Sequence, residues 1–586
     1  MKKIVALVLI LIMLVPFASG CAKNESADLV VFGNIYTAEK DNNGLAEAFA
    51  VKDGKYIYVG TKDEAKKYIE EGKTEVFDKS GEGLIIPGCT EGHAHYFGVY
   101  GIGKVLPGQG CSYKELLEVI KDETKGKKTT QFISFGWKTI ELSEDRAAGK
   151  NFAEEIEAVA PGIPVVLIDN TGHSAVCNTT ALKKAGLLEN PKVRGGEVAL
   201  DKDGNPSGFV SDQAVGYICD KAIDDDILTE EQAKQACSIG AELLLKQGYT
   251  NALDAYINQF AEREMSDILK KLDESGELKI NVASCYNLKS YDAENYKEKV
   301  DRVAQIAEEC KSKHYNPANI KLFADGVVES ATGWMFEEYK NVEKGKEHGN
   351  IIWDVEELKK LVSYANSKDI LVHTHSFGDA ACNAVLDAYI YSNKENGKEY
   401  RNCLGHVRNI KSEDVIRAAE NKIPIAENLI WHSDVDENVP EQKKQKDMIL
   451  QHISEDTYNN GYPMKSLIDN GVIMSSSTDA PAAMSIEGNI MNVLEVATTG
   501  IMPEDSAKPY AEKELISVRE GLEALTINGA WQLGLENERG SVKVGKYADF
   551  VILDKNILDY QGEQLRTIHN TQILSTYFEG KPAYTK

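Results

Sequence analysis

The chain has 586 residues, of which 66 are Lys or Arg and 92 are Asp or Glu, so its formal net charge at pH 7 is −26. With 42% hydrophobic residues it can bury a large core, in one large domain or in about two to four smaller ones, which excludes disorder as its main state. The acidic charge and the lack of a basic patch disfavour binding to nucleic acid phosphates, so no nucleic acid partner is expected.

The N-terminus has the pattern of an export signal. Two lysines precede an apolar run over residues 4–17, and the small residues Ala-Ser-Gly then lead to Cys21. The run is shorter than the roughly 20 residues that a membrane-spanning helix needs. We therefore expect residues 1–20 to be a signal peptide, Cys21 to carry a lipid and residues 21–27 to be a tether. The chain would then be an exported lipoprotein on the extracytoplasmic face of a bacterial membrane, with simple secretion as the alternative.

Both ends of the chain are rich in β-strand patterns. Short apolar strands follow residue 27, and two of them flank the turn residues Asp53 and Gly54, which is a hairpin signal. Residues 540–554 show the same alternation. We expect residues 28–84 and 536–586 to pair into one small β-sandwich domain.

The middle of the chain alternates between strand-like and helix-like segments, which is typical of parallel strands joined by crossover helices. About eight such units suit a (β/α)8 barrel over residues 85–535, with insertions, better than an open doubly wound α/β sheet, which is the alternative. The strand-like runs cover residues 84–87, 132–135, 165–169, 251–255, 280–285, 320–324, 370–375, 423–426 and 472–475.

Two H-x-H pairs follow predicted strands: His93 with His95, and His373 with His375. Residues two apart on a strand share a face, so a pair at the carboxyl end of a barrel strand can direct two imidazoles into the barrel mouth. Imidazole there suits zinc. The alternative is one core histidine and one surface histidine in each pair. Four other histidines lie in polar contexts and are expected at the surface: His314, His348, His452 and His569.

Three more strand ends carry chemically active side chains. Lys321 lies within an apolar strand, where its ammonium must be paired, neutralised or modified to avoid a large desolvation cost. His406 ends the apolar run that starts at residue 403, and Asp479 ends the run that starts at residue 472. Each residue alone has a structural explanation, but together with the histidine pairs they indicate one site.

These motifs resemble those of a known family. From residue 27 to the C-terminus the chain resembles the amidohydrolase superfamily, and within it the YtcJ-like metal-dependent hydrolases that include N-substituted formamide deformylases. The resemblance implies a distorted (β/α)8 barrel with a β-sandwich built from both chain ends. The motifs that carry it are Pro87-Gly88, His93-Ala-His95, Gly172-His173, Lys321-Leu-Phe-Ala-Asp-Gly326, His375-Ser-Phe-Gly-Asp379, Gly405-His406 and Thr478-Asp-Ala-Pro481.

The resemblance also implies a metal site with one or two zinc ions per chain, or another divalent metal. One ion would be held by His93, His95 and Asp479. A carboxylated Lys321 would bridge to a second ion, which His375 and His406 would hold.

Two choices within this ligand set depend on neighbouring residues. His375 is preferred over His373 because it directly precedes Ser-Phe-Gly-Asp. Carboxylation of Lys321 would turn a buried cation into an anionic ligand. The alternative is an ion pair between Lys321 and Asp325, with a single metal.

The implied reaction is attack of an activated water on a carbonyl carbon. Asp479 would accept the proton of the water and deliver it to the leaving nitrogen. His173 would bind the developing oxyanion or the substrate, or else only cap a loop. Glu91, Thr171 and Thr478 depart from the family pattern, which leaves the ligands intact but puts the substrate in doubt.

We therefore expect a zinc-dependent amidohydrolase that cleaves a carbon–nitrogen bond other than a peptide bond in a small amide-type substrate. A deaminase or a cyclic-amide hydrolase on the same scaffold is the alternative within enzymes. A non-catalytic, substrate-binding lipoprotein is the alternative outside them. The sequence is compatible with a homo-oligomer.

Overall fold

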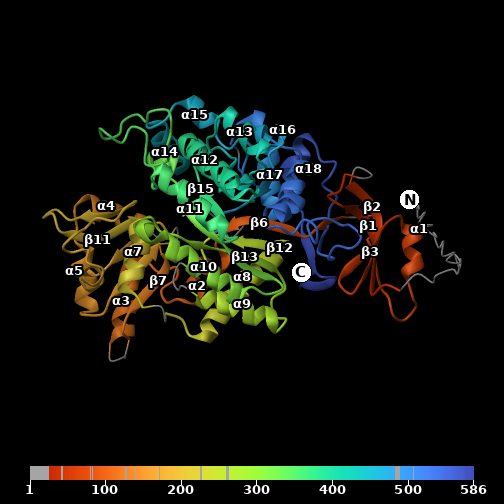
Figure 1. Ribbon diagram of the computed structural model, residues 1–586, viewed down its shortest axis with the longest axis horizontal. Coiled ribbons are helices and arrows are strands. Elements are labelled where there is room, and N and C mark those ends of the chain that lie inside the picture. Colours follow the sequence, from red (N-terminus) through yellow and green to blue (C-terminus); the bar gives the residue numbers. More distant parts are fainter. Residues whose placement is uncertain are drawn as a thin grey trace, which may run out of the picture.

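The computed structural model describes residues 26–586 with several short gaps (Figure 1). The predicted signal peptide and Cys21 lie outside the described residues. In the part of the chain that is described, no helix has the length and apolar character required to span a membrane. The gaps are residues 41–43, 80, 82, 126–128, 138, 170–171, 225–226, 259–262, 482–488 and 506.

A barrel of eight parallel strands forms the centre of the molecule, between two other sheets (Figure 1). The order of pairing is β6-β12-β13-β14-β15-β16-β17-β18, so each strand lies beside its neighbour in the chain. The strands are β6 (Cys89–Ala94), β12 (Tyr249–Asp254), β13 (Asn281–Asn287), β14 (Tyr315–Phe323), β15 (Leu371–His375), β16 (Cys403–Gly405), β17 (Ile425–Glu427) and β18 (Met474–Ser476).

The barrel is almost closed where β6 and β18 meet. Just beyond the end of β18, the backbone N–H of Asp479 donates to the carbonyl of His93 (2.8 Å), and the N–H of His95 donates to the carbonyl of Ala480 (2.8 Å). The predicted (β/α)8 barrel is thereby confirmed, and the open sheet is not found. Helices join the successive strands from β12 onward: α9 (Glu264–Glu274), α10 (Tyr296–Cys310), α11 (Val355–Ser367), α12 (Asp379–Asn396), α13 (Ser412–Glu420) and α16 (Met464–Asp469).

Helix α8 (Glu230–Lys246) fixes the segment that follows the first histidine pair. A capping box between Thr229 and Gln232 begins the helix. Its buried stripe packs on η3 (Tyr96–Gly101), and the contact is so close that a Cβ on Gly240 would lie 2.8 Å from the carbonyl oxygen of Tyr96. Glycine is therefore needed at this position of α8, because a side chain would displace the turn after His95.

An inserted five-stranded sheet lies between β6 and β12 in the chain, at the opposite end of the molecule from the first strands, residues 29–60 (Figure 1). It contains two of the runs predicted for the barrel, residues 132–135 and 165–169. They are parallel strands, as expected, but not barrel strands, because a short apolar run fits the buried strand of any covered sheet. In the order of pairing, the sheet consists of β10 (Gly196–Leu200), β11 (Pro206–Asp212), β9 (Ser174–Cys177), β8 (Val165–Asp169) and β7 (Phe132–Trp137).

The two chain ends meet in a third sheet of eight strands, so their predicted pairing is confirmed. β5 pairs antiparallel with β19, with Pro87 opposite Phe550, which moves the run at residues 84–87 out of the barrel and into this terminal sheet. The predicted hairpin turn lies between β2 and β3, where Lys52 pairs with Lys55. The strands are β1 (Leu29–Tyr36), β2 (Leu45–Lys52), β3 (Lys55–Gly60), β4 (Glu75–Lys79), β5 (Leu84–Pro87), β19 (Phe550–Leu553), β20 (Ile573–Phe578) and β21 (Lys581–Thr585).

Two histidines predicted at the surface are largely buried instead. The ring of His314 lies between a barrel carboxylate and a terminal-sheet carboxylate, with Nδ1 2.6 Å from Oδ1 of Asp273 and Nε2 3.0 Å from Oε1 of Glu579. Nδ1 of His569 is 2.6 Å from the buried carboxylate of Glu495. Polar neighbours in the sequence did not reveal these partners, because all three carboxylates come from distant parts of the chain.

Candidate metal centre

A cavity of about 1830 Å³ lies at the carboxyl ends of the barrel strands. One wall consists of barrel strand ends and the loops after them, and another includes residues 191–198, 212–213 and 215–216 of the inserted segment. This is the end of the barrel at which barrel enzymes carry their active sites. All seven residues that the sequence predicts for chemistry line this cavity: His93, His95, His173, Lys321, His375, His406 and Asp479.

His93 is the centre of the predicted ligand group. It lies in β6, and its side chain is completely buried. Its Nε2 atom is 3.0 Å from Nζ of Lys321, 3.2 Å from Nε2 of His406 and 3.4 Å from Oδ1 of Asp479. The ligand atoms of His93, His406 and Asp479 lie within 4.8 Å of one another. Atoms that each lie about 2 Å from a metal are up to about 4 Å apart, so the spacings of 3.2, 3.4 and 4.0 Å between these three residues suit metal binding.

Asp479 and His95 complete this side of the group. Oδ1 of Asp479 is 2.9 Å from Nε2 of His95. Burial favours the protonated acid, but the electrostatic interaction with His406, the hydrogen bond from His95 and the nearby Lys321 outweigh it and hold the pKa of Asp479 well below its usual value. Asp479 is therefore a carboxylate at neutral pH, able to accept a proton or bind a cation.

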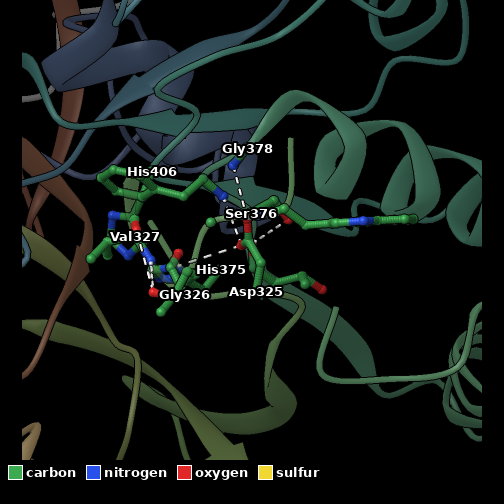
Figure 2. A network of polar contacts seen from close by, with 12 residues as sticks. Asp325, Gly326, Val327, His375, Ser376, Gly378 and His406 are labelled. Carbon is green, nitrogen blue, oxygen red and sulfur yellow. Dashed lines mark hydrogen bonds and ion pairs between the residues drawn. The ribbon is translucent and has the colours of Figure 1, made fainter. Parts of the chain in front are cut away.

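Lys321 and Asp325 lie in the same strand-end segment but do not pair. The carboxylate of Asp325 accepts three backbone N–H groups, from Trp334 (2.8 Å), Phe377 (3.0 Å) and Gly378 (2.9 Å) (Figure 2). Lys321 is buried beside His93 instead, and burial lowers its pKa to about 8. The alternative of an ion pair between Lys321 and Asp325 is therefore not found.

The second histidine pair occupies two different environments on β15. Nε2 of His375 donates to the carbonyl of Gly326 (3.0 Å; Figure 2), and its ring centre is 5.1 Å from that of His406 in the same cavity. His373 does not line that cavity; its Nε2 lies 2.7 Å from Nδ1 of His93. The structure thus brings His375 to the cavity and His373 to the far side of His93.

His173 reaches the cavity from the inserted sheet. It directly precedes β9, and its Nδ1 lies 3.5 Å from Oδ1 of Asp212 at the end of β11. The backbone N–H of Asp212 also donates to the carbonyl of His173 (2.9 Å). Because 52% of its side chain is exposed, His173 is available to a bound molecule. The neighbouring Thr171, a departure from the family pattern, lies outside the described residues.

Glu91 is a functional candidate whose role the sequence did not reveal. Its buried carboxylate accepts the backbone N–H groups of His93 (3.0 Å) and Thr478 (3.0 Å), and the hydroxyl of Thr478 (2.8 Å). Burial raises the pKa of Glu91 to about 8. Two departures from the family pattern, Glu91 and Thr478, therefore bind each other and join β6 to the segment that carries Asp479. We call this contact the Glu91–Thr478 clasp.

Aromatic rings cover the other side of the ligand group. Trp431 stacks on His406, with ring centres 5.4 Å apart, and Phe377 stacks on His375, with ring centres 5.6 Å apart. Both aromatic residues line the cavity. They restrict the orientation of the two imidazoles and give the cavity an apolar surface next to the predicted metal site.

The chemistry of the donors fits a divalent metal. Burial lowers the pKa of both His93 and His406 well below the usual value, so each imidazole is neutral at pH 7 and keeps a lone pair for a ligand bond. A carboxylate and neutral imidazoles that converge from different strands are a donor set for zinc and similar ions. Nδ1 of His95 is also buried, and it has no hydrogen-bond partner among the described residues.

Comparisons with known proteins agree with this geometry. A model of the amidohydrolase family matches residues 80–584. The chain is 24% identical to the putative amidohydrolase YtcJ of Bacillus subtilis (strain 168), over 94% of this chain and 98% of that protein. It is also 24% identical to the N-substituted formamide deformylase of Arthrobacter pascens, over 95% of this chain and 98% of that protein.

The fold is similar to solved structures as well. One is an uncharacterised metal-dependent hydrolase from Pyrococcus horikoshii OT3, with a TM-score of 0.67 and 21% identity over 91% of this chain and 98% of that chain. The resemblance inferred from the motifs is thereby confirmed. The chain belongs to the amidohydrolase family, the metal-dependent hydrolases of carbon–nitrogen bonds.

Proposed function

We propose that this protein is a zinc-dependent hydrolase of a non-peptide amide bond in a small molecule. The observation that carries the proposal is the convergence of imidazoles, a carboxylate and a buried lysine from separate strand ends on one cavity. His93, His95 and Asp479 would hold one ion. His375 and His406 would hold a second, with Lys321 between the two ions.

Lys321 would contribute as a carbamate. Its pKa of about 8 leaves part of the population as neutral amine at neutral pH. That amine attacks carbon dioxide: an N–C bond forms, an electron pair of one C=O bond moves to oxygen, and one N–H proton leaves to solvent. The product is an anionic oxygen ligand, which removes the cost of a buried ammonium.

The residues around the cavity supply the steps of amide hydrolysis. When bound, the metal would lower the pKa of a water molecule to about 7 and polarise the substrate carbonyl. Asp479, ionised and 2.9 Å from His95, would accept the proton of the water and pass it to the leaving nitrogen. His173 would donate a hydrogen bond to the oxygen on which negative charge develops.

The N-terminal sequence pattern predicts the cellular location of the protein. Export with lipid attachment at Cys21 would put the cavity outside the cytoplasm, tethered to the membrane by residues 21–27. Mass spectrometry of the mature protein tests this: an N-terminal diacylglyceryl cysteine supports the anchor, and a free N-terminus at residue 21 or later supports simple secretion.

Elemental analysis of the purified mature protein tests the metal site. We expect about two zinc ions per chain, falling to about one or fewer in Lys321→Ala. Amide hydrolysis by Asp479→Asn should fall by about 10²–10⁴-fold, because the amide cannot act as the base. About one ion in the wild type would support a mononuclear hydrolase.

The same preparation separates the alternatives. Absence of metal after zinc supplementation would overturn the enzyme proposal and favour a substrate-binding lipoprotein. The substrate panel should include N-substituted amides, cyclic amides and amino-heterocycles. Turnover confined to the last group would replace amide hydrolysis with deamination.

A further inference from the structure

We infer that His373 is a positioning residue that fixes the tautomer and ring orientation of His93. This inference rests on the proposed metal site. Nε2 of His373 lies 2.7 Å from Nδ1 of His93, and the two side chains are 3% and 0% exposed. His373 does not line the large cavity, so it acts through His93 and not on a substrate.

The two nitrogens of His93 face different partners. Nε2 faces the ligand group, at 3.0 Å from Lys321, 3.2 Å from His406 and 3.4 Å from Asp479. Only Nδ1 faces His373. A neutral imidazole carries one N–H, and the nitrogen that binds a metal must be the one without it.

The contact with His373 selects the useful tautomer. When Nδ1 of His93 donates its N–H to Nε2 of His373, the lone pair of His93 Nε2 points to the ligand group. His373 then carries its own proton on Nδ1. Outer hydrogen bonds of this kind orient metal-binding histidines and raise their affinity for the metal.

The backbone is shaped to allow this histidine–histidine contact. His373 pairs with Lys321 on β14 and with Cys403 on β16 in the barrel ladders, which fixes its depth in the barrel. On β16, a Cβ at Gly405 would lie 2.9 Å from Nε2 of His373 and 3.1 Å from Nδ1 of His93. Any side chain at position 405 would therefore intrude between the two rings.

His375 cannot take over this role. Its Nε2 is engaged by the carbonyl of Gly326 (3.0 Å), and the ring lies in the large cavity. The two histidines of the second H-x-H pair thus have different roles. His375 is a candidate metal ligand, and His373 orients His93, a candidate ligand on β6.

Two variants of similar size test the inference. His373→Gln can keep an acceptor near the position of Nε2, whereas His373→Leu removes it. We expect zinc affinity, measured by competition with a chelator, to fall about 10- to 100-fold in His373→Leu and to stay within about threefold in His373→Gln. The visible spectrum of the cobalt-substituted protein should change in His373→Leu and match the wild type in His373→Gln.

A control on the same strand separates positioning from damage to the barrel. Thr374 is equally buried, and its hydroxyl contacts the hydroxyl of Tyr389 (2.7 Å), away from the ligand group. Thr374→Val should leave zinc affinity and the cobalt spectrum unchanged even where it lowers the melting temperature.

The outcomes distinguish this inference from the proposed function. Wild-type protein that binds zinc, with unchanged affinity in His373→Leu, would overturn the inference alone. Equal losses in the Gln and Leu variants would also overturn it, since they would make His373 itself a ligand. Wild-type protein without zinc would overturn the proposed function and the inference together.

Discussion

Three residues of the candidate site hold backbone conformations that non-glycine residues rarely adopt. The φ angles of His406, Asp479 and Asp212 are 64°, 54° and 53°. Such a conformation costs about 1–3 kcal/mol and persists only where the surrounding structure imposes it. Two of the three are predicted ligands and the third is the partner of His173. At the scale of the residue, this conformational free energy is spent at strand ends, where the chain turns sharply to present a functional side chain.

His173 allows a direct test of a role in substrate chemistry. Its Nδ1 atom lies 3.5 Å from Oδ1 of Asp212, and its imidazole is half-exposed in the cavity. We expect His173→Gln to lower kcat by about 10²-fold, as loss of one oxyanion donor does, with unchanged zinc content. Steady-state kinetics and elemental analysis measure the two quantities. Unchanged kcat together with lower thermal stability would instead support the loop-capping role.

At the scale of the element, apolar runs predicted strands better than they predicted which sheet each strand joins. Six of the runs became barrel strands, but β6 and β16 were not among the runs. β6 reads Cys-Thr-Glu-Gly-His-Ala, which contains no apolar stretch, and β16 has only three residues, which is too short a stretch to identify as a strand. Both carry or adjoin a predicted ligand, since functional side chains replace apolar ones there. The strand-end positions of His93 and His406 revealed what hydrophobicity did not.

The sequence predicted the residues of the site more completely than their contacts. Spacing placed His93, Lys321 and Asp479 at strand ends, and all three converge. The partners of these residues depend on strand register, which one sequence does not specify. The contact between His373 and His93 spans 280 residues, and the Glu91–Thr478 clasp spans 387 residues.

The clasp predicts a contrast between two substitutions of Thr478. Thr478→Ser keeps the hydroxyl that donates a hydrogen bond to Glu91, whereas Thr478→Val leaves a buried carboxyl oxygen of Glu91 without that donor. We expect Thr478→Val to lower the free energy of unfolding by about 1–3 kcal/mol and Thr478→Ser to stay near the wild type. Urea titration of the mature protein measures this. Equal stabilities of the two variants would show that the hydroxyl contributes nothing to the joint between β6 and the Asp479 segment.

At the scale of the whole molecule, a partly buried cluster of charged and polar side chains joins the barrel to the terminal sheet. His314 contacts Asp273 on the barrel side and Glu579 on the terminal side, and Glu579 also contacts Lys313 and Arg539. Burial alone would raise the pKa of Glu579, but these partners outweigh it and hold the pKa well below its usual 4.5. The terminal sheet is therefore attached through a carboxylate that must stay ionised.

This attachment predicts sensitivity to acid. A carboxyl group with a lowered pKa in the folded state stabilises the fold fully above its unfolded pKa and loses that contribution as the pH falls below about 4.5. We expect the free energy of unfolding of the wild type to fall more steeply between about pH 5 and 3 than that of Glu579→Gln. Urea unfolding at each pH measures the slopes. The exposed Glu71→Gln serves as the control, and a Glu579→Gln slope as steep as the wild type's would contradict the prediction.

The joint between β6 and β18 links the metal centre to the completion of folding. His95 and Asp479 are 384 residues apart, and their segments meet only when the first and last barrel strands come together. Such long-range contacts form late and slowly in a folding chain. A partly synthesised chain therefore lacks the assembled ligand set, and we expect full metal affinity only in the complete barrel. If export delivers the chain unfolded, the metal would have to be acquired from the extracytoplasmic environment, after the barrel closes.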